Sequence, residues 1–489
     1  MWFLILQTER ISGPRWMCCL PGAVRLGASV IDTWEGTTMH RRTTATATAT
    51  TACAAALAVG LATIPAATVA AAPHEGPSSS TGGLPVGAAG AVVDPADQEA
   101  VREALREAAA EAATQVAARR PAPSAAPQDV PGPQRLPSLP RPDLEAALDQ
   151  LVADGAIGVT ATVETPSLRW ADAAGRRHLD GPAPALERSA LRVASNTKMM
   201  VATLVMQEVE AGTWALDTRV DDVIPGLFPD HPEVTIRHLL SHTSGMPLGT
   251  YELITPYAGT DPEDWDAFVS AIGRDYTDAE HIDAVNAAPW VGEPGAQFSY
   301  SNAGYVALGM LLEQVTGEEV EALVDERIRR PAGMGQTRVL DDPGLRGPAL
   351  HEAMFVDGRG WIGLDGFDPD VFSHSGSALS TVEDLDDLTR ALMSGELVSQ
   401  ASVEQMVTPS SDNPLGYGLG TYAIPDPCRP GELLHGHDGA SFGSLSLALS
   451  SRDGTRQLAL GVTGRDLTAS QDALYDLNDV LVPLLLATC

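Results

Sequence analysis

Strand-like segments stand near both ends of the part of this chain that is expected to fold, and a helix-rich middle separates them. Residues 159–163 and 168–173 resemble strands in composition and alternation. Residues 444–449 and 457–462 do so again, on either side of an Asp-Gly pair at 453–454 that favours a hairpin turn. Strands this far apart can share one sheet if the helices between them form a lobe. The pattern therefore predicts an α+β fold: an antiparallel sheet flanked by N- and C-terminal helices, with an all-α lobe inserted.

The expected helices have recognisable start or stop signals. Asp143 is a possible N-cap for apolar positions at helical spacing. Gly212 and Gly317 follow two longer helical runs and are suited to end them. The helices predicted on this basis cover residues 144–152, 197–211, 235–240, 303–316 and 467–486.

The first 72 residues are interpreted as two joined segments. Residues 1–38 show no usable periodicity, and our hypothesis is that the natural start is Met39. The basic residues 40–42, an apolar run around 54–62 and three alanines at 70–72 predict a secretory signal peptide over residues 39–72. A membrane anchor is the alternative, but the run is only mildly apolar. We expect no stable membrane span in the mature chain.

Residues 73–142 are predicted to be an Ala/Pro-rich spacer, largely disordered. Within this spacer, residues 97–120 contain good helix formers, but their apolar positions are mostly alanine. We expect a marginal helix there with little to bury. Residues 121–142 are proline-rich and predict a stiff linker. The folded domain is therefore expected over residues 143–489.

Charge and cysteine content narrow the choice of partners and compartment. The formal net charge of -33 argues against nucleic acid or an anionic membrane as a partner. After cleavage near residue 72, only Cys428 and Cys489 remain, and in an oxidising compartment they are candidates for one disulfide. Two free thiols are the alternative. No cofactor or metal is implied, and we expect a monomer.

The tetrapeptide Ser195-Asn196-Thr197-Lys198 is the first element of a candidate catalytic site. Serine and lysine three residues apart lie on one face of a helix. Ser195 is the candidate nucleophile, and its own N–H is a candidate oxyanion donor at a helix start. Lys198 can act as its base only if the pKa of its ammonium group falls from about 10.4.

Two later segments supply the remaining candidates. Tyr300 is an alternative base or the acid for the leaving group, and Asn302 could orient Lys198 or the substrate. His437 and Asp438 start a strand segment that could line the opposite wall of the site. There Gly439 would let a substrate approach the backbone closely, and the N–H of Ala440 would be a second oxyanion donor.

These three segments resemble the motifs of the serine penicillin-recognising hydrolases, specifically the class C β-lactamase and serine D-Ala-D-Ala carboxypeptidase group. Residues 236–245, 376–385 and 416–420 resemble other stretches of that family, and the likeness covers roughly 143–485. It implies the two-lobed β-lactamase/transpeptidase-like fold, a serine acyl-enzyme and no metal.

The third motif departs from the family in two ways. His437 stands where β-lactamases usually have lysine. A histidine here is a feature of the carboxypeptidase and esterase branches. Asp438 stands where a hydroxyl residue usually contacts the substrate carboxylate. An ionised Asp438 would repel that carboxylate. Our hypothesis is that the substrate carries a neutral or cationic group there, or that Asp438 points away.

Other motifs in the sequence have both a catalytic or metal-binding interpretation and a structural one. Ser441 lies in a Gly-x-Ser-x-Gly stretch, but no histidine follows His437 in the sequence, as an α/β-hydrolase would require. His238 and His242, and likewise His435 and His437, have spacings that could bind a metal. Structural histidines are the better interpretation of the first pair.

The sequence thus predicts an exported, cell-wall-facing serine hydrolase that forms an acyl-enzyme on Ser195. The favoured activity is that of a D-alanyl-D-alanine carboxypeptidase acting on peptidoglycan stem peptides. Alternatives are a class C-like β-lactamase, or an esterase or D-amino-acid amidase of the same fold. A sensor that is acylated once by a β-lactam or peptide, without turnover, is an alternative of a different class.

Overall fold

The computed structural model describes residues 95–118 and 139–489, apart from 260, 262, 411–412, 414–415 and 469–473. The predicted leader at 39–72 lies outside the described residues, as do 73–94 and 119–138 of the predicted spacer. Among the described residues, no helix is both long and apolar enough to cross a membrane.

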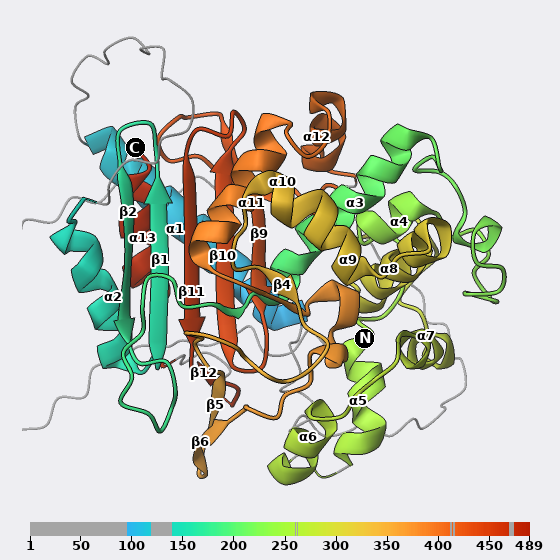
Figure 1. Ribbon diagram of the computed structural model, residues 1–489, viewed down its shortest axis with the longest axis horizontal. Helices are drawn as coiled ribbons and strands as arrows, with labels where there is room; N and C mark the ends of the chain where they lie inside the picture. Colours follow the sequence, from blue (N-terminus) through green and yellow to red (C-terminus); the bar gives the residue numbers. More distant parts are fainter. Residues whose placement is uncertain are drawn as a thin grey trace, which may run out of the picture. The chain divides into compact units, whose positions relative to one another are not determined.

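A six-stranded antiparallel sheet forms the centre of the domain, in the order β2-β1-β11-β10-β9-β8 (Figure 1). Strand β1 pairs with β2 on one side and with β11, from the C-terminal part of the chain, on the other, so strands from both ends share one sheet, as predicted. The turn at Gly454 joins β10 to β11. The strands of this sheet are β1 Gly158–Glu164, β2 Arg169–Gly175, β8 Tyr422–Pro425, β9 Leu433–Ala440, β10 Ser444–Ser451 and β11 Gln457–Thr463.

Each face of the sheet is covered by helices, because strand residues alternate between two apolar faces. Helices α2 (Pro142–Asp154) and α13 (Asn478–Ala487) pack on one face, where Leu447 of β10 joins their core. Helix α11 (Val382–Ser394) packs on the other face, with Ala448 (Figure 1). This arrangement confirms the predicted α+β fold.

The middle of the chain forms the helical part of the domain, beside the sheet (Figure 1). Its helices are α3 Thr197–Ala211, α4 Ile236–Leu240, α5 Thr250–Ala258, α6 Trp265–Ile272, α7 Asp278–Ala287, α8 Asn302–Thr316, α9 Val320–Val324, α10 Arg330–Ala332 and α12 Gln400–Val407. Two small sheets, β3-β7-β4 and β12-β5-β6, consist of β3 Leu191–Arg192, β4 Arg338–Val339, β5 Ala353–Val356, β6 Gly360–Gly363, β7 Ala378–Ser380 and β12 Arg465–Asp466.

The expectation that residues 97–120 have little to bury was wrong. Residues Pro95–Ala118 form helix α1, which packs against α13 and strands β8 and β9. Its buried residues fall at helical spacing on one face: Arg102, Leu105, Ala108, Ala109 and Ala112. Small alanine side chains allow a helix axis to approach its neighbour closely, so an alanine stripe is a packing surface here. The folded domain therefore includes part of the predicted spacer.

Two helix boundaries also differ from the prediction. The last helix begins at Asn478 rather than near 467. Arg465 and Asp466, just before the predicted start, form β12 and pair with β5, and residues 469–473 lie outside the described residues. Asp143 is not an N-cap: α2 begins with Pro142, so Asp143 lies in the first turn.

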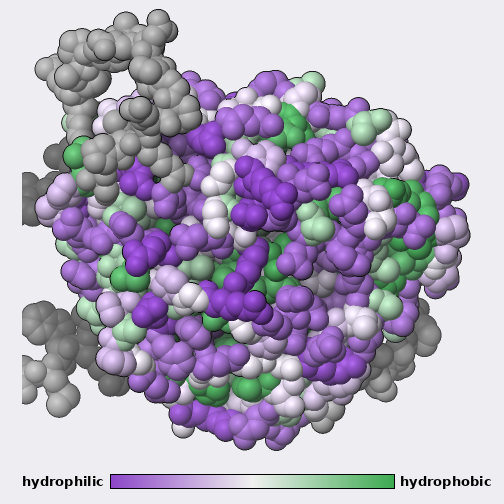
Figure 2. Space-filling view, in the orientation of Figure 1, coloured by the Kyte–Doolittle hydropathy of each residue, from purple (hydrophilic) through white to green (hydrophobic). Residues whose placement is uncertain are grey.

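The structure joins Cys428 and Cys489 in a disulfide, as predicted, with their Cα atoms 5.0 Å apart. This bond ties the end of the chain, just after α13, to the loop between β8 and β9. On the face shown in Figure 2, hydrophilic residues predominate and apolar areas are small and separate.

Candidate active site

Ser195 lies in a tight turn, Ala194–Asn196, that leads directly into α3. Ala194 has φ 43°, a left-handed conformation that is costly for a residue with a Cβ. The turn is held in place by the sheet, since Asn196 donates to Oγ of Ser446 on β10 (2.8 Å). The nucleophile candidate is therefore presented on a fixed, strained turn, and its side chain is only 5% exposed.

Lys198 lies in the first turn of α3 and is fully buried, and its Nζ has three oxygen neighbours. Nζ lies 3.1 Å from Oγ of Ser195, 2.7 Å from Oδ1 of Asn302 and 2.9 Å from the carbonyl oxygen of Ser375. Ser375 follows α8 in sequence and precedes β7, so three distant segments meet at this amine. Sequence reasoning predicted the contacts with Ser195 and Asn302 but not the one with Ser375.

The environment of Lys198 favours its neutral form. Burial lowers the pKa of Lys198 well below 10.5, Arg102 lowers it further, and Asp438 opposes them. A neutral amine has two N–H groups and one lone pair. The carbonyl groups of Asn302 and Ser375 can accept both N–H groups, which leaves the lone pair for the hydroxyl proton of Ser195. This is the geometry of a general base.

Tyr300 stands beside this pair, at the end of the loop before α8. Its ring centroid is 4.9 Å from Nζ of Lys198. The Tyr300 ring also packs against the ring of His242, tilted by 33°, with centroids 4.0 Å apart. Asn302 starts α8 and donates from Nδ2 to Oγ1 of Thr250 (2.9 Å), which directs its Oδ1 toward Lys198. The structure thus brings Ser195, Lys198, Tyr300 and Asn302 together.

His437 belongs to a hydrogen-bonded chain that includes a tyrosine and a second histidine. The backbone N–H of Ser301 donates to Nδ1 of His242, 3.1 Å away, so Nε2 of that neutral ring carries the proton. Nε2 of His242 lies 3.2 Å from Oη of Tyr417, which lies 3.0 Å from Nε2 of His437. Nδ1 of His437 faces the carbonyl oxygen of Asp438 and must donate to it.

The direction of this chain follows from these contacts. His242 donates to the phenol oxygen of Tyr417, whose O–H then donates to His437. Burial lowers the pKa of His437 from 6.5 to about 3, an effect that Arg102 and Lys198 reinforce and Asp438 opposes. Burial also lowers the pKa of His242 well below 6.5. Both rings are therefore neutral near pH 7, and the hydrogen bonds of His437 go to Tyr417 and its own strand.

Asp438 follows His437 on β9, and its Oδ1 lies 3.8 Å from Nδ1 of His437. Its Oδ1 accepts a hydrogen bond from Nε of Arg102, 3.1 Å away, and the two side chains are 1% and 3% exposed. Arg102 is on α1, a segment that sequence reasoning placed in a spacer. The signal that could have found it is a single arginine in register with the apolar stripe.

The packing of β9 against its neighbours leaves no room for a side chain at Gly439. A Cβ at this position would lie 2.1 Å from the carbonyl oxygen of Val193 and 2.5 Å from Oγ of Ser446. The close approach that we predicted for a substrate is made by the backbone just before Ser195. The N–H of Ala440 as an oxyanion donor stays a prediction, with Ala440 on the β9 segment that packs against the Ser195 turn.

The β-lactamase family model matches residues 144–462. The chain belongs to the β-lactamase family. Penicillin-binding protein 4* of Bacillus subtilis is 27% identical over 287 residues, which cover 54% of this chain and 58% of that protein. Esterase EstB of Burkholderia gladioli is 30% identical over 207 residues, which cover 39% of this chain and 49% of that protein. The chain thus spans about half the length of these curated relatives.

Solved structures show the same fold for this β-lactamase family member. A D-stereospecific amidohydrolase from Streptomyces sp. superposes with a TM-score of 0.60 at 27% identity, covering 69% of this chain and 97% of that chain. A penicillin-binding protein from Bacillus halodurans gives a TM-score of 0.57 at 22% identity, covering 68% and 97%. The proteins similar to this chain therefore include a penicillin-binding protein, an esterase and an amidohydrolase.

The competing sequence motifs have structural roles in this family member. Ser441 is buried, and its Oγ contacts Oε1 of Glu352. The ring of His238 accepts at Nδ1 from the N–H of Thr235, completing the cap of α4. His242 is also held by hydrogen bonds, to the N–H of Ser301 and to Oη of Tyr417, and through Tyr417 it connects to His437.

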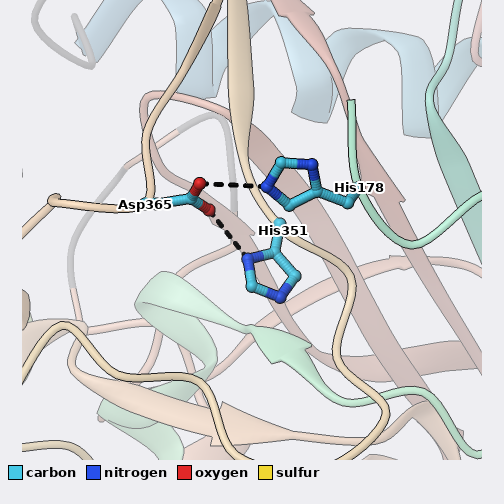
Figure 3. Close-up of side chains that lie close together, drawn as sticks. All are labelled: His178, His351 and Asp365. Atoms are coloured by element: carbon cyan, nitrogen blue, oxygen red, sulfur yellow. Dashed lines mark hydrogen bonds and ion pairs between the residues drawn. The ribbon is translucent and has the colours of Figure 1, made fainter. Parts of the chain in front are cut away.

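Three side chains from separate loops, His178, His351 and Asp365, lie together in a cluster with metal-ligating atoms (Figure 3). Asp365 contacts Nε2 of His178 at 2.9 Å and Nδ1 of His351 at 2.8 Å. The N–H of Asp180 donates to Nδ1 of His178, so the neutral ring carries its proton on Nε2 and has no lone pair there for a metal. The contacts therefore favour a hydrogen-bonded cluster.

Proposed function

We propose that this chain is a serine hydrolase that forms an acyl-enzyme on Ser195 and acts as a D-alanyl-D-alanine carboxypeptidase. The observation that carries the proposal is the placement of the buried Lys198 amine between Ser195, Asn302 and Ser375. Its two acceptors occupy the N–H groups, and its lowered pKa leaves a base facing the hydroxyl. A lysine kept only for packing or solubility needs none of these contacts.

In the proposed reaction, Lys198 takes the hydroxyl proton as Oγ of Ser195 bonds to the carbonyl carbon of the penultimate D-alanine. The N–H groups of Ser195 and Ala440 hold the oxygen of the tetrahedral intermediate. The C–N bond then breaks, and the terminal D-alanine leaves as an amine after receiving a proton from Tyr300 or Lys198. Water, deprotonated by the same base, hydrolyses the ester and restores Ser195.

His437 supports this reaction as a neutral ring. Its hydrogen bonds to Tyr417 and to its own strand fix the β9 wall beside Tyr300, with ring centroids of His437 and Tyr300 6.4 Å apart. Export to the cell-wall side is part of the proposal. The disulfide between Cys428 and Cys489 supports it, since such bonds persist in oxidising compartments.

Asp438 favours a second candidate, a D-amino-acid amidase. Asp438 is already paired with Arg102 and has no hydrogen-bond donor for a substrate carboxylate, whereas an amide substrate has no carboxylate to hold. The D-stereospecific amidohydrolase from Streptomyces sp., at 27% identity, supports this alternative.

The test uses three substrates with the purified full chain: a peptide ending in D-Ala-D-Ala, a D-amino-acid amide and a simple p-nitrophenyl ester. Release of D-alanine, abolished in Ser195→Ala and retained in the exposed control Ser270→Ala, supports the carboxypeptidase. Release of ammonia alone transfers the proposal to the amidase. A single acylation without turnover identifies a sensor, and activity that survives Ser195→Ala refutes the mechanism.

A further inference from the structure

Asp438 needs a cationic partner in this site. It is 1% exposed, and a buried carboxylate that is neither paired nor hydrogen-bonded is strongly unfavourable. Its charge also acts on the catalytic amine, since Asp438 raises the pKa of Lys198 whereas Arg102 lowers it. An uncompensated Asp438 would therefore raise the pKa of Lys198 and favour its protonated form, which cannot accept a proton from Ser195.

Arg102 supplies this partner from α1. Its Nε donates to Oδ1 of Asp438 at 3.1 Å, and its guanidinium carbon lies 5.0 Å from the ring centroid of Tyr300 and 5.5 Å from that of Tyr422. The guanidinium group of Arg102 thus lies between Asp438 and Tyr300. Burial lowers the pKa of Arg102, but Asp438 and the tyrosines raise it by more, so Arg102 stays charged.

The helix holds Arg102 in this position through an apolar anchor one turn further on. Leu105 is fully buried and faces Leu447 of β10 and Leu481 of α13 across a small apolar cavity. Yet α1 ends at Ala118, well before residue 144, where the match to the family begins. The residue that balances Asp438 therefore comes from outside the family's shared segment.

We propose that Arg102 is a positioning residue of this active site, which neutralises Asp438 and braces Tyr300 so that Lys198 can act as a base. This inference rests on the proposed function of Ser195 and Lys198. It explains how this chain accommodates an aspartate at position 438: Arg102 of α1 supplies the positive charge that Asp438 needs. The helix completes the catalytic centre, and its removal exposes Lys198 to an unbalanced negative charge.

The charge environment of Lys198 makes the proposal specific. The groups that face it from the neighbouring elements are Arg102, Asp438, His242, Tyr300, Tyr305 and His437. The histidines are neutral near pH 7, so Arg102 and Asp438 are the charged members of this set, and they have opposite signs. Removing Arg102 should move the acidic limb of the pH profile of kcat/KM to higher pH, and removing Asp438 should move it to lower pH.

The experiment measures kcat and KM for the p-nitrophenyl ester between pH 5 and 10. Arg102→Ala should shift the acidic limb of kcat/KM up by about one pH unit, which lowers activity on that limb about tenfold, mostly through kcat. Asp438→Asn should shift the limb to lower pH. The double variant should return close to the wild-type profile, because neither charge remains. Arg102→Lys keeps the charge and should also stay near wild type, and it remains informative if Arg102→Ala does not fold.

Arg106→Ala is the matched control, since Arg106 lies one turn along α1 and pairs with the exposed Glu103. Its profile should equal that of the wild type. The proposal is overturned if Arg102→Ala accelerates hydrolysis at all pH values, which would make α1 a cover over the site. It is also overturned if the single variants shift the limb in the same direction, or if the double variant is no closer to wild type than Arg102→Ala. A wild-type chain without Ser195-dependent activity would instead refute the proposed function.

Discussion

The phenol oxygen of Tyr417 lies 3.0 Å from Nε2 of His437, and it is also the acceptor for the N–H of His242. All three side chains are buried. Tyr417→Phe leaves one buried donor and one buried acceptor without a partner, and each costs about 1–3 kcal/mol. We expect a lower free energy of unfolding and a reduced kcat, measured by urea denaturation and ester hydrolysis. Tyr257→Phe, at an exposed tyrosine, is the control. A Tyr417→Phe variant with wild-type stability and kcat would contradict the hydrogen-bonded chain from His242 through Tyr417 to His437.

Gly439→Ala tests how closely β9 approaches the nucleophile turn. The added methyl group meets the backbone oxygen of Val193, so either the strand or the turn with Ser195 must move. We expect destabilisation of about 1–3 kcal/mol and a loss of acylation greater than this destabilisation explains. Gly335→Ala, with no atom within 4 Å of the added Cβ, should be silent in both measurements. A fully active Gly439→Ala variant would show that there is room for a methyl group between β9 and the carbonyl oxygen of Val193.

Acid should weaken the fold through buried histidines. Burial and Arg452 lower the pKa of His435 from 6.5 to about 4, with Glu404 opposing. The unfolded chain therefore binds a proton that the folded chain does not between about pH 6.5 and 4, and the free energy of unfolding falls as pH decreases through this window. His435→Gln should reduce this loss, by about 1.4 kcal/mol per unit of pKa shift. Urea denaturation at several pH values measures it, and an equal loss in wild type and variant would contradict the prediction.

Reduction of the disulfide should loosen the C-terminal helix. The bond closes a 61-residue separation and anchors the end of α13. We expect dithiothreitol to lower the free energy of unfolding by about 2–5 kcal/mol and lower Tm accordingly. A Cys428→Ser, Cys489→Ser double variant should start at the reduced value and not respond to the reductant. A wild-type Tm that is insensitive to reduction would contradict a stabilising role.

Local signals carried most of the fold prediction. Helix α3 ends at Ala211 as predicted because Gly212 adopts φ 77°, which terminates a helix without strain. The Asp-Gly pair placed the β10–β11 turn for a similar reason, since Gly454 has φ 67°. Ser195 and Lys198 could be paired from their spacing of three residues, because the turn Ala194–Asn196 leads directly into α3 and keeps the two side chains on one side.

The remaining parts of the site depend on contacts across long sequence separations. Helix α1 offers mostly alanine, and its packing becomes visible only when α13 lies beside it. Arg102 resembles any solvent-exposed arginine in a charged helix until Asp438 is opposite. The link from His242 to His437 has no local signal, because it runs through Tyr417, which is 175 residues from His242.

Ser195 acting as the nucleophile, activated by Lys198, can be tested by mass spectrometry. The full chain is incubated briefly with a fluorescent penicillin, and the adduct is located by peptide mapping. We expect one acyl group on Ser195, no adduct in Ser195→Ala, and acylation at least 100-fold slower in Lys198→Ala, roughly the loss expected for a removed general base. An adduct on another residue, such as Ser441, or equal labelling of Lys198→Ala, would contradict it.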